Sequence, residues 1–345
     1  MSEEGNGTAD DAPAAARGTG LLQSNRLRLV GIVISVLSIG GVVVWALNQP
    51  APRLPNDASG WLAFAAAIGV YAIATGIRSE RWLSLLRRDG IPARRGDAWG
   101  LTVVGFMGNN ILPARGGDAL SAYLMSNRTQ TLWRYTVASL IAVRVLDLVA
   151  LLLIYFVVAQ GVLSGIDLPG DSLLGAEIAI AAVIVLGGLG LWIAVRRGHL
   201  QGLGRLIGEL LGTTRRLWSA HGAAMFALSL AIWAAEAITL LLCGSAVGLE
   251  MSVLESLYLI GLAGVFVLVP SGPGYAGTLD AALLFGAGAI GASPELALSF
   301  LLIARFVVFV PITLAGLALM VTTYGWDSFG LRGDAEATPS PATPG

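Results

Sequence analysis

Six long apolar stretches dominate the sequence. They cover about residues 27–47, 60–80, 134–159, 174–195, 223–246 and 296–323. Each approaches the ~20 residues that a helix needs to cross roughly 30 Å of hydrocarbon. Only 12% of the 345 residues are charged and 55% are hydrophobic, whereas an ordinary soluble domain is about 25% charged. The sequence therefore predicts an all-α integral membrane protein with about six spanning helices, and it argues against a water-soluble globular enzyme.

Two further apolar regions are interrupted near their centres. Residues 98–127 are broken by NNILPARGG at 109–117, and residues 253–290 are broken by VPSGPGYAG at 269–277. Proline removes a backbone donor and glycine permits turns, so neither region is expected to form one continuous helix. Each region instead predicts a helix, an irregular tip and a second helix.

Arginine placement predicts the orientation in the membrane. All 21 basic residues are arginine. Placing the N-terminus in the cytoplasm assigns 17 of them to cytoplasmic segments and leaves only Arg53 outside. The remaining three, Arg115, Arg144 and Arg305, fall within the membrane. Because arginine-rich loops stay in the cytoplasm, we expect a multi-pass plasma-membrane protein with both termini cytoplasmic.

This count requires each interrupted region to return to the side from which it entered, so both regions are candidate re-entrant hairpins.

Polar ends flank the apolar part of the chain. Residues 1–25 and 326–345 lack the apolar residues needed for a core, and both are expected to be disordered tails. One polytopic transmembrane domain, residues 26–325, lies between them.

The two interrupted regions belong to similar units. Each is followed by an apolar span that contains an arginine; Pro113 precedes Arg144 by 31 residues, and Pro273 precedes Arg305 by 32. The first unit enters from the arginine-rich side and the second from the opposite side. They would then form an inverted repeat, as in secondary transporters whose site lies at the midplane. Chance similarity between apolar segments is the alternative, since Leu, Val and Gly match easily.

Charged residues inside the predicted spans need partners or functions, because each costs about 2.5–3.5 kcal/mol on insertion scales. Arg144 and Asp147 lie three residues apart and are expected to form a local pair. Arg305 has no acidic residue within four positions, so its partner must come from another element or from a ligand. Glu236 could pair with Arg305 or carry a proton.

The interrupted regions and one helix end supply further candidates. Arg115 and Asn110 lie in the first tip, and Asp118 is expected near the N-terminus of the arm that follows. A helix N-terminus favours phosphate, although Asp118 could simply cap this arm. Asp280 has the matching position in the second region. Glu80 lies at a predicted helix end, where its carboxylate can reach water.

Three motifs carry a family resemblance. NNILPARGGDALSAYLM (109–125), PSGPGYAGTLDAAL (270–283) and IAR (303–305) resemble the flippase-like transmembrane family, the membrane module of lysylphosphatidylglycerol synthases. The resemblance covers about residues 26–325. It implies lipid translocation and not lipid synthesis.

The family pattern also implies site residues. An acidic residue commonly follows the glycines of each motif, as Asp118 and Asp280 do here. The arginine that the family commonly places near position 121 is replaced by Ser121 or Ala122.

Together these features predict a transporter that moves an anionic or phosphate-linked lipid between leaflets, with the headgroup held by Arg115, Arg144 and Arg305. No cofactor or metal is expected, and a net charge of −1 argues against a nucleic-acid partner. The expected partner is the lipid substrate, with an envelope-lipid enzyme as a second candidate. Alternatives are a carrier for a small soluble anion, a noncatalytic scaffold for such an enzyme, and an intramembrane transferase, although no paired acidic motif marks catalysis.

Overall fold

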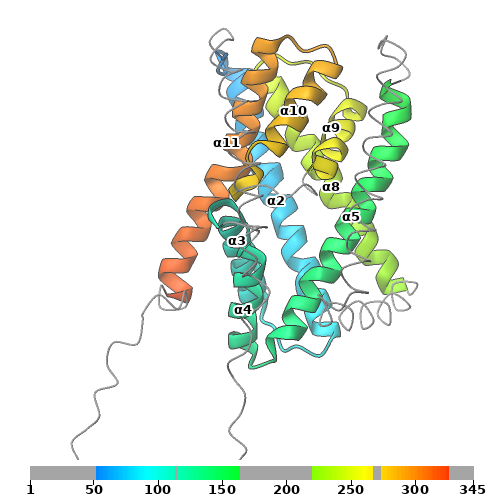
Figure 1. Ribbon diagram of the computed structural model, residues 1–345. Coiled ribbons are helices and arrows are strands. Elements are labelled where there is room, and N and C mark those ends of the chain that lie inside the picture. The colour runs from blue at the N-terminus through cyan, green and yellow to red at the C-terminus, as the bar shows by residue number, and fades with distance from the viewer. Residues whose placement is uncertain (1–51, 113–115, 164–219, 267–272, 326–345) are drawn as a thin grey trace, which may run out of the picture.

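The computed structural model describes residues 52–112, 116–163, 220–266 and 273–325, and these parts of the chain contain helices and no strand (Figure 1). The elements are α2 (Ala58–Arg88), α3 (Arg95–Ile111), α4 (Gly116–Thr129), α5 (Trp133–Leu163), α8 (Ala220–Ala246), α9 (Val253–Phe266), the 3₁₀ turn η2 (Pro273–Tyr275), α10 (Thr278–Ala289), α11 (Pro294–Leu319) and the π-helical turn η3 (Met320–Tyr324).

Four of the described helices are long and apolar enough to cross a membrane. They are α2, α5, α8 and α11 continued by η3. Each contains one of the predicted spans, because a sustained apolar run determines both the length of a helix and its preference for lipid. The other two predicted spans, 27–47 and 174–195, lie outside the described residues, as do the two predicted tails.

The first described helix extends beyond its predicted end. Asp57 begins α2 by accepting a hydrogen bond from the Gly60 N–H at 2.7 Å. The helix then passes residue 80 and ends at Arg88, and Arg78 and Arg81 are only 6% and 1% exposed. The arginine count included Arg78 and Arg81 among the 17 in cytoplasmic segments, whereas both are buried within a long helix. Their charges are compensated inside the bundle, so the helix can continue through them.

Both interrupted regions form pairs of short helices. In the first, α3 and α4 lie side by side; in the second, α9 is followed by η2 and α10. The four arms contain 12 to 17 residues, or about 18–26 Å at 1.5 Å per residue. Each arm is shorter than the ~30 Å hydrocarbon core. The prediction of two helices in each region is confirmed, while residues 113–115 and 267–272 of the predicted tips lie outside the described residues.

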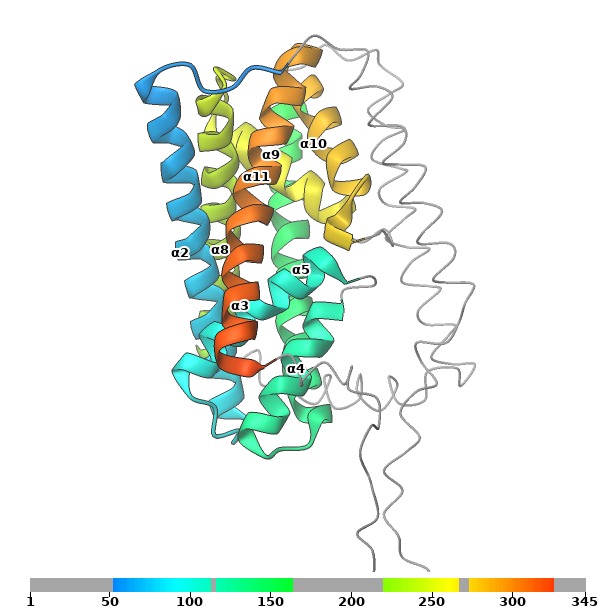
Figure 2. The ribbon, with the colours of Figure 1, turned by 90° about the vertical axis from the view of Figure 1, so that its left-hand side faces the viewer.

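The two hairpins occupy opposite ends of the bundle, and their tips meet near its centre. Figure 1 shows α3 and α4 in the lower half and α9 and α10 in the upper half. In Figure 2 the tip of the first hairpin faces η2 and the start of α10, and η2 contacts α3. Asn110 Nδ2 donates to Thr313 Oγ1 at 2.8 Å, which ties this tip to α11. The helix α11 contains Pro311 and bends near its middle.

Glycines allow the arms of the first hairpin to approach closely. A Cβ atom on Gly117 would lie 2.0 Å from the Gly105 carbonyl oxygen and 2.3 Å from the Asn109 nitrogen. Across the same interface, Ser121 Oγ donates to the Leu101 carbonyl at 2.7 Å. Ser121, one of the two residues near which the resemblance implies an arginine, therefore lies where α4 packs against α3.

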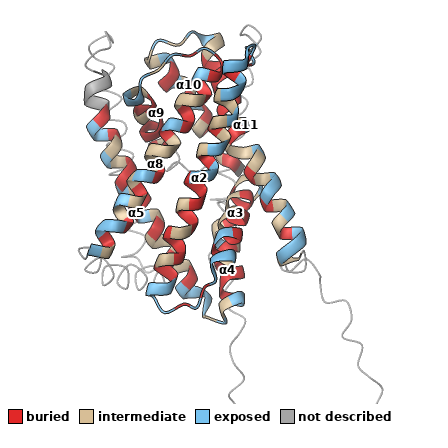
Figure 3. Cartoon of the chain, turned by 180° about the vertical axis from the view of Figure 1, so that it is seen from behind, coloured by how far each residue is buried: buried red, intermediate tan, exposed pale blue. Residues whose placement is uncertain are grey.

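Burial follows the pattern expected of helices in lipid. Figure 3 shows buried residues directed towards the centre of the bundle and exposed residues on its outer faces. On α5 the exposed residues include large apolar side chains at helical spacing, namely Val145, Val149, Leu153 and Phe156. This apolar surface is suited to contact with lipid.

Candidate functional site

A central cavity of about 390 Å³ lies where the two hairpin tips meet. This volume falls within the roughly 300–1,000 Å³ typical of small-molecule sites. Most lining residues are apolar and come from all the long helices and both hairpins. The charged lining residues are Arg78, Arg144, Asp147, Glu236 and Arg305. The cavity therefore combines an apolar wall with a concentrated group of charges.

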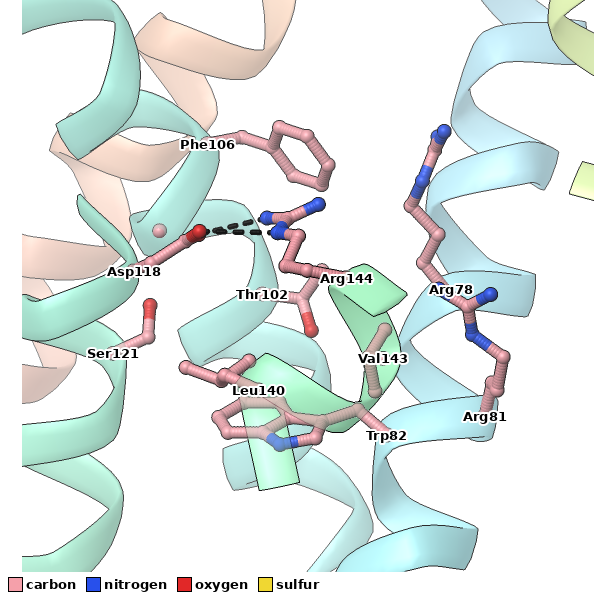
Figure 4. Close-up of a pocket in the computed structure, with 11 residues that line it drawn as sticks. Arg78, Arg81, Trp82, Thr102, Phe106, Asp118, Ser121, Leu140, Val143 and Arg144 are labelled. Carbon is pink, nitrogen blue, oxygen red and sulfur yellow. Dashed lines mark hydrogen bonds and ion pairs between the residues drawn. The ribbon is translucent and has the colours of Figure 1, made fainter. Parts of the chain in front are cut away.

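Arg144 binds a carboxylate from the first hairpin. Its Nε and Nη2 atoms donate to the two Asp118 oxygens at 3.0 and 2.7 Å (Figure 4). Asp118, in the first turn of α4, also accepts from Asn109 Nδ2 at 3.0 Å. The expected local pair with Asp147 is the weaker contact, because Arg144 Nη1 lies 3.9 Å from that carboxylate.

Arg305 makes the corresponding contact with the second hairpin. Its Nε atom donates to Asp280 Oδ1 at 2.5 Å, and Nη1 donates to the Gly274 carbonyl at 2.7 Å. Asp280 Oδ2 accepts from the Gly277 N–H at 2.8 Å, at the start of α10. The prediction that the partner of Arg305 comes from another element is confirmed. The suggested partner Glu236 was wrong, because the hairpin acid occupies this guanidinium.

The two pairs have the same construction. In each, an aspartate in the first turn of the hairpin's second arm binds an arginine of the next long helix. The sequence separations are nearly equal, 26 residues for Asp118 and Arg144 and 25 for Asp280 and Arg305. This agreement extends the correspondence between the two units from their sequence spacing to their side-chain contacts.

The sequence interpretation missed the roles of Arg78 and Arg81. Arg78 Nη1 lies 2.5 Å from Glu236 Oε1. Arg81 donates to both Asp147 oxygens, at 2.6 and 2.9 Å, and also to Ser229. The sequence contained two signals for these roles. Arg78 and Arg81 lie three residues apart and therefore share a helix face. In addition, the carboxylates Asp147 and Glu236 lie in predicted spans that offer them too few basic partners.

The remaining candidates have different positions. Asn110 lines the cavity as well as joining α3 to α11. Glu80 lies apart from it, with its carboxylate 2.9 Å from Arg95 Nε and 2.6 Å from Trp99 Nε1. Its side chain is 37% exposed. The prediction that Glu80 lies at a helix end was wrong, because α2 continues to Arg88. Arg115 lies outside the described residues.

A second, smaller chamber of about 40 Å³ adjoins these charges. Arg78, Phe106 and Arg144 line both spaces. Figure 4 shows Phe106 beside Arg144, with Arg78 and Arg81 on the facing helix α2. The Phe106 ring centroid lies 5.5 Å from Arg78 Cζ and 6.0 Å from Arg144 Cζ. An aromatic ring therefore lies near two of the cavity's cations.

The family of the chain follows from its sequence. Residues 28–316 match the family described as the lysylphosphatidylglycerol synthase TM region. The chain belongs to this family. The resemblance seen in the three motifs is thereby confirmed, and the match includes both hairpins and both aspartate–arginine pairs. Family membership and the long apolar helices together identify a multi-pass membrane protein.

Two curated relatives are similar over different lengths. A UPF0104 membrane protein of Methanothermobacter thermautotrophicus is 22% identical over 268 residues, which cover 69% of this chain and 78% of the relative. Glycosyltransferase AglD of Haloferax volcanii is 28% identical over 159 residues, 46% of this chain. The match spans only 24% of that glycosyltransferase. No solved structure matches the chain.

Proposed function

We propose that this protein translocates an anionic or phosphate-linked lipid between membrane leaflets and holds the headgroup in the central cavity. One observation carries the proposal: Arg78, Arg144 and Arg305 line a largely apolar cavity where the two hairpin tips meet. A guanidinium group can bind phosphate oxygens through two parallel hydrogen bonds. The apolar lining is suited to the part of the lipid next to its headgroup.

Arg144 is the principal proposed phosphate ligand. Its side chain is 35% exposed, and the only ion-pair contact of Nη1 among the described residues is the one with Asp147 at 3.9 Å. Arg305 is 21% exposed and uses three nitrogens to hold Asp280 and the carbonyls of Gly274 and Tyr275. Arg144 therefore has donor capacity for a headgroup, whereas Arg305 also positions the second tip.

The arrangement in the membrane is part of the proposal. We infer that both hairpins are re-entrant, that the two units form an inverted repeat, and that 27–47 and 174–195 complete six spans. Several arginines support a cytoplasmic location for one end of the bundle: Arg87, Arg88, Arg94, Arg95 and Arg128 flank the first hairpin. Arg53 precedes α2, and the start of that helix lies at the opposite end of the bundle (Figure 1). By the positive-inside rule this distribution supports a cytoplasmic position for the first hairpin's end of the bundle. We propose a plasma-membrane protein with both termini cytoplasmic.

The proposed role is transport without catalysis, with the lipid as substrate. An envelope-lipid enzyme is proposed as a second partner. The partial similarity to a protein named as a glycosyltransferase supports this partner. The proposal requires the lipid itself to enter the cavity, whereas a scaffold role would not.

The test is lipid translocation by purified protein in vesicles. Fluorescent phospholipids are incorporated in both leaflets, and a membrane-impermeant quencher reports how fast the inner pool reaches the outside. We expect Arg144→Gln to slow translocation at least tenfold, because the amide cannot supply the charged fork. Arg144→Lys keeps the charge but loses the bidentate geometry, so an intermediate rate is expected.

Arg53→Gln is the matched control, since Arg53 forms an exposed pair with Glu295 away from the cavity. Melting temperatures in detergent identify any variant that has lost its fold. Wild-type lipid rates in a well-folded Arg144→Gln protein would refute headgroup binding by this residue. Uptake of a small anion without lipid movement would favour the carrier alternative, and inactivity towards both would favour the scaffold.

A further inference from the structure

Tyr71, in the middle of α2, has a buried ring and an accessible hydroxyl group. The residue is only 5% exposed, and its ring belongs to the main hydrophobic cluster, to which α8, α9 and α11 also contribute. Its oxygen has no hydrogen-bond partner among the described residues. The unpaired side-chain atoms that these residues enclose completely include Arg78 Nε and Trp233 Nε1 but not the Tyr71 oxygen. The hydroxyl group therefore remains open to contact with another molecule.

The surroundings of this hydroxyl group place it at the charged part of the central cavity. Tyr71 itself lines the cavity. The groups within electrostatic range of its hydroxyl are Glu236, Arg78, Tyr275 and Arg144. All four line the same cavity. The accessible oxygen therefore faces the cavity, in the region of the guanidinium that we propose as the phosphate ligand.

The hydroxyl group lacks an acceptor that the cavity contents can supply. Buried polar groups are almost always hydrogen-bonded in folded proteins. Glu236 accepts no hydrogen bond from Tyr71, and its charge is balanced by Arg78 at 2.5 Å. An acceptor is therefore expected from a molecule in the cavity, and the positive charge of Arg144 favours an anionic one. A phosphate would bring several acceptor oxygens to this place.

We infer that Tyr71 is a further substrate-binding residue, whose hydroxyl group donates a hydrogen bond to the phosphate that Arg144 holds. The inference rests on the proposed function, which supplies the phosphate. Arg144 belongs to α5 and Tyr71 to α2, so the phosphate is bound between these two helices. The hydroxyl group adds a donor to the site without adding a charge.

The experiment measures how the full-length protein in detergent binds three probes. Dihexanoyl phosphatidic acid has a phosphate and two short acyl chains, dihexanoylglycerol has the chains without the phosphate, and inorganic phosphate has no chains. The concentration that gives half of the maximal rise in melting temperature reports the affinity for each probe. We expect Tyr71→Phe to weaken phosphatidic acid binding about tenfold or more, as for one hydrogen bond to a charged acceptor. Binding of dihexanoylglycerol should not change.

The stability of the ligand-free protein separates substrate binding from a structural role. Because the Tyr71 hydroxyl has no partner among the described residues, Tyr71→Phe should keep or raise the melting temperature without ligand. Tyr258→Phe is the matched control. Tyr258 lies on α9, is 2% exposed and is not one of the residues that line the cavity. This variant should bind phosphatidic acid as the wild type does.

The outcomes distinguish failure of this inference from failure of the proposed transport. Wild-type affinity for phosphatidic acid in Tyr71→Phe, equal effects of the two tyrosine variants, or no response of the wild type to either phosphate probe would overturn the inference. A tenfold loss of binding in Tyr71→Phe, with no lipid movement in vesicles, would keep Tyr71 as a phosphate ligand and refute transport. If inorganic phosphate binds as tightly as phosphatidic acid and Tyr71→Phe weakens both, Tyr71 binds the phosphate of a small anion and the lipid is not the substrate.

Discussion

The buried arginines differ in how much of each side chain the cavity can reach. Arg81 and Asp147 have side chains that are 1% and 5% exposed and bind each other through two hydrogen bonds. Arg144, by contrast, is 35% exposed. A charged side chain that no ligand can contact can affect function only by stabilising the fold. Arg81 is therefore expected to hold helices together, whereas Arg144 is expected to bind the substrate.

The first prediction at the residue scale concerns Arg81. Arg81→Gln leaves the Asp147 carboxylate buried, and its one remaining ion-pair contact within the described parts of the chain is the 3.9 Å contact to Arg144. Breaking one side of a buried ion pair costs about 3–5 kcal/mol, so we expect a clear fall in melting temperature in detergent. Arg53→Gln, which removes an exposed ion pair, should change it little.

A double variant makes this prediction sharper. Arg81→Met with Asp147→Leu removes both charges and should recover most of the lost stability, because no buried charge remains unpaired. A melting temperature for Arg81→Gln equal to that of the wild type would show that the pair does not stabilise the bundle.

Local sequence reasoning was successful for some of these residues and not for others. It correctly indicated that Arg305 needs a partner from another element, because no acid lies nearby on its own helix. It expected Arg144 to rely on Asp147, since residues three apart meet on a helix. The closer partner is Asp118, which α4 brings against α5 from 26 residues away. Helix periodicity contains no information about which neighbouring helix presents a competing carboxylate.

At the scale of elements, the first hairpin depends on close backbone contact between α3 and α4. Gly117→Ala should destabilise the protein, because its Cβ would lie 2.0 Å from the Gly105 carbonyl oxygen, a backbone atom that cannot rotate away. In an unhindered helix the same change stabilises by up to about 1 kcal/mol.

Gly69 provides the matched control for this prediction. It lies in α2 with nothing within 4 Å of an added Cβ. Gly69→Ala should therefore keep or slightly raise the melting temperature, while Gly117→Ala lowers it and slows lipid translocation. Equal behaviour of the two variants would mean that α3 and α4 do not pack as closely as described.

The proposed topology of the whole molecule predicts which residues share a membrane side. Arg94 precedes α3 and Asn127 lies near the end of α4, so both belong to the arginine-rich end. In a Cys243→Ala background, Arg94→Cys and Asn127→Cys should resist an impermeant maleimide in intact cells. Arg53→Cys should react with it.

All three cysteines should react after the membrane is permeabilised, which confirms that each thiol is accessible. Labelling of Arg94→Cys and Asn127→Cys from opposite sides would turn the first hairpin into a full crossing and remove the basis of the inverted repeat. Labelling of both from outside would instead reverse the orientation of the bundle.

The sequence by itself determined the helical class, the positions of the four described long helices and the two interrupted regions. These properties depend on hydrophobicity and on proline and glycine, which act locally along the chain. Only the tertiary structure decided the ion-pair partners, the burial of Arg78 and Arg81, and the cavity between the hairpin tips. Those features depend on which helices lie side by side, because a buried charge takes the carboxylate that packing brings closest in space, however distant it is in sequence.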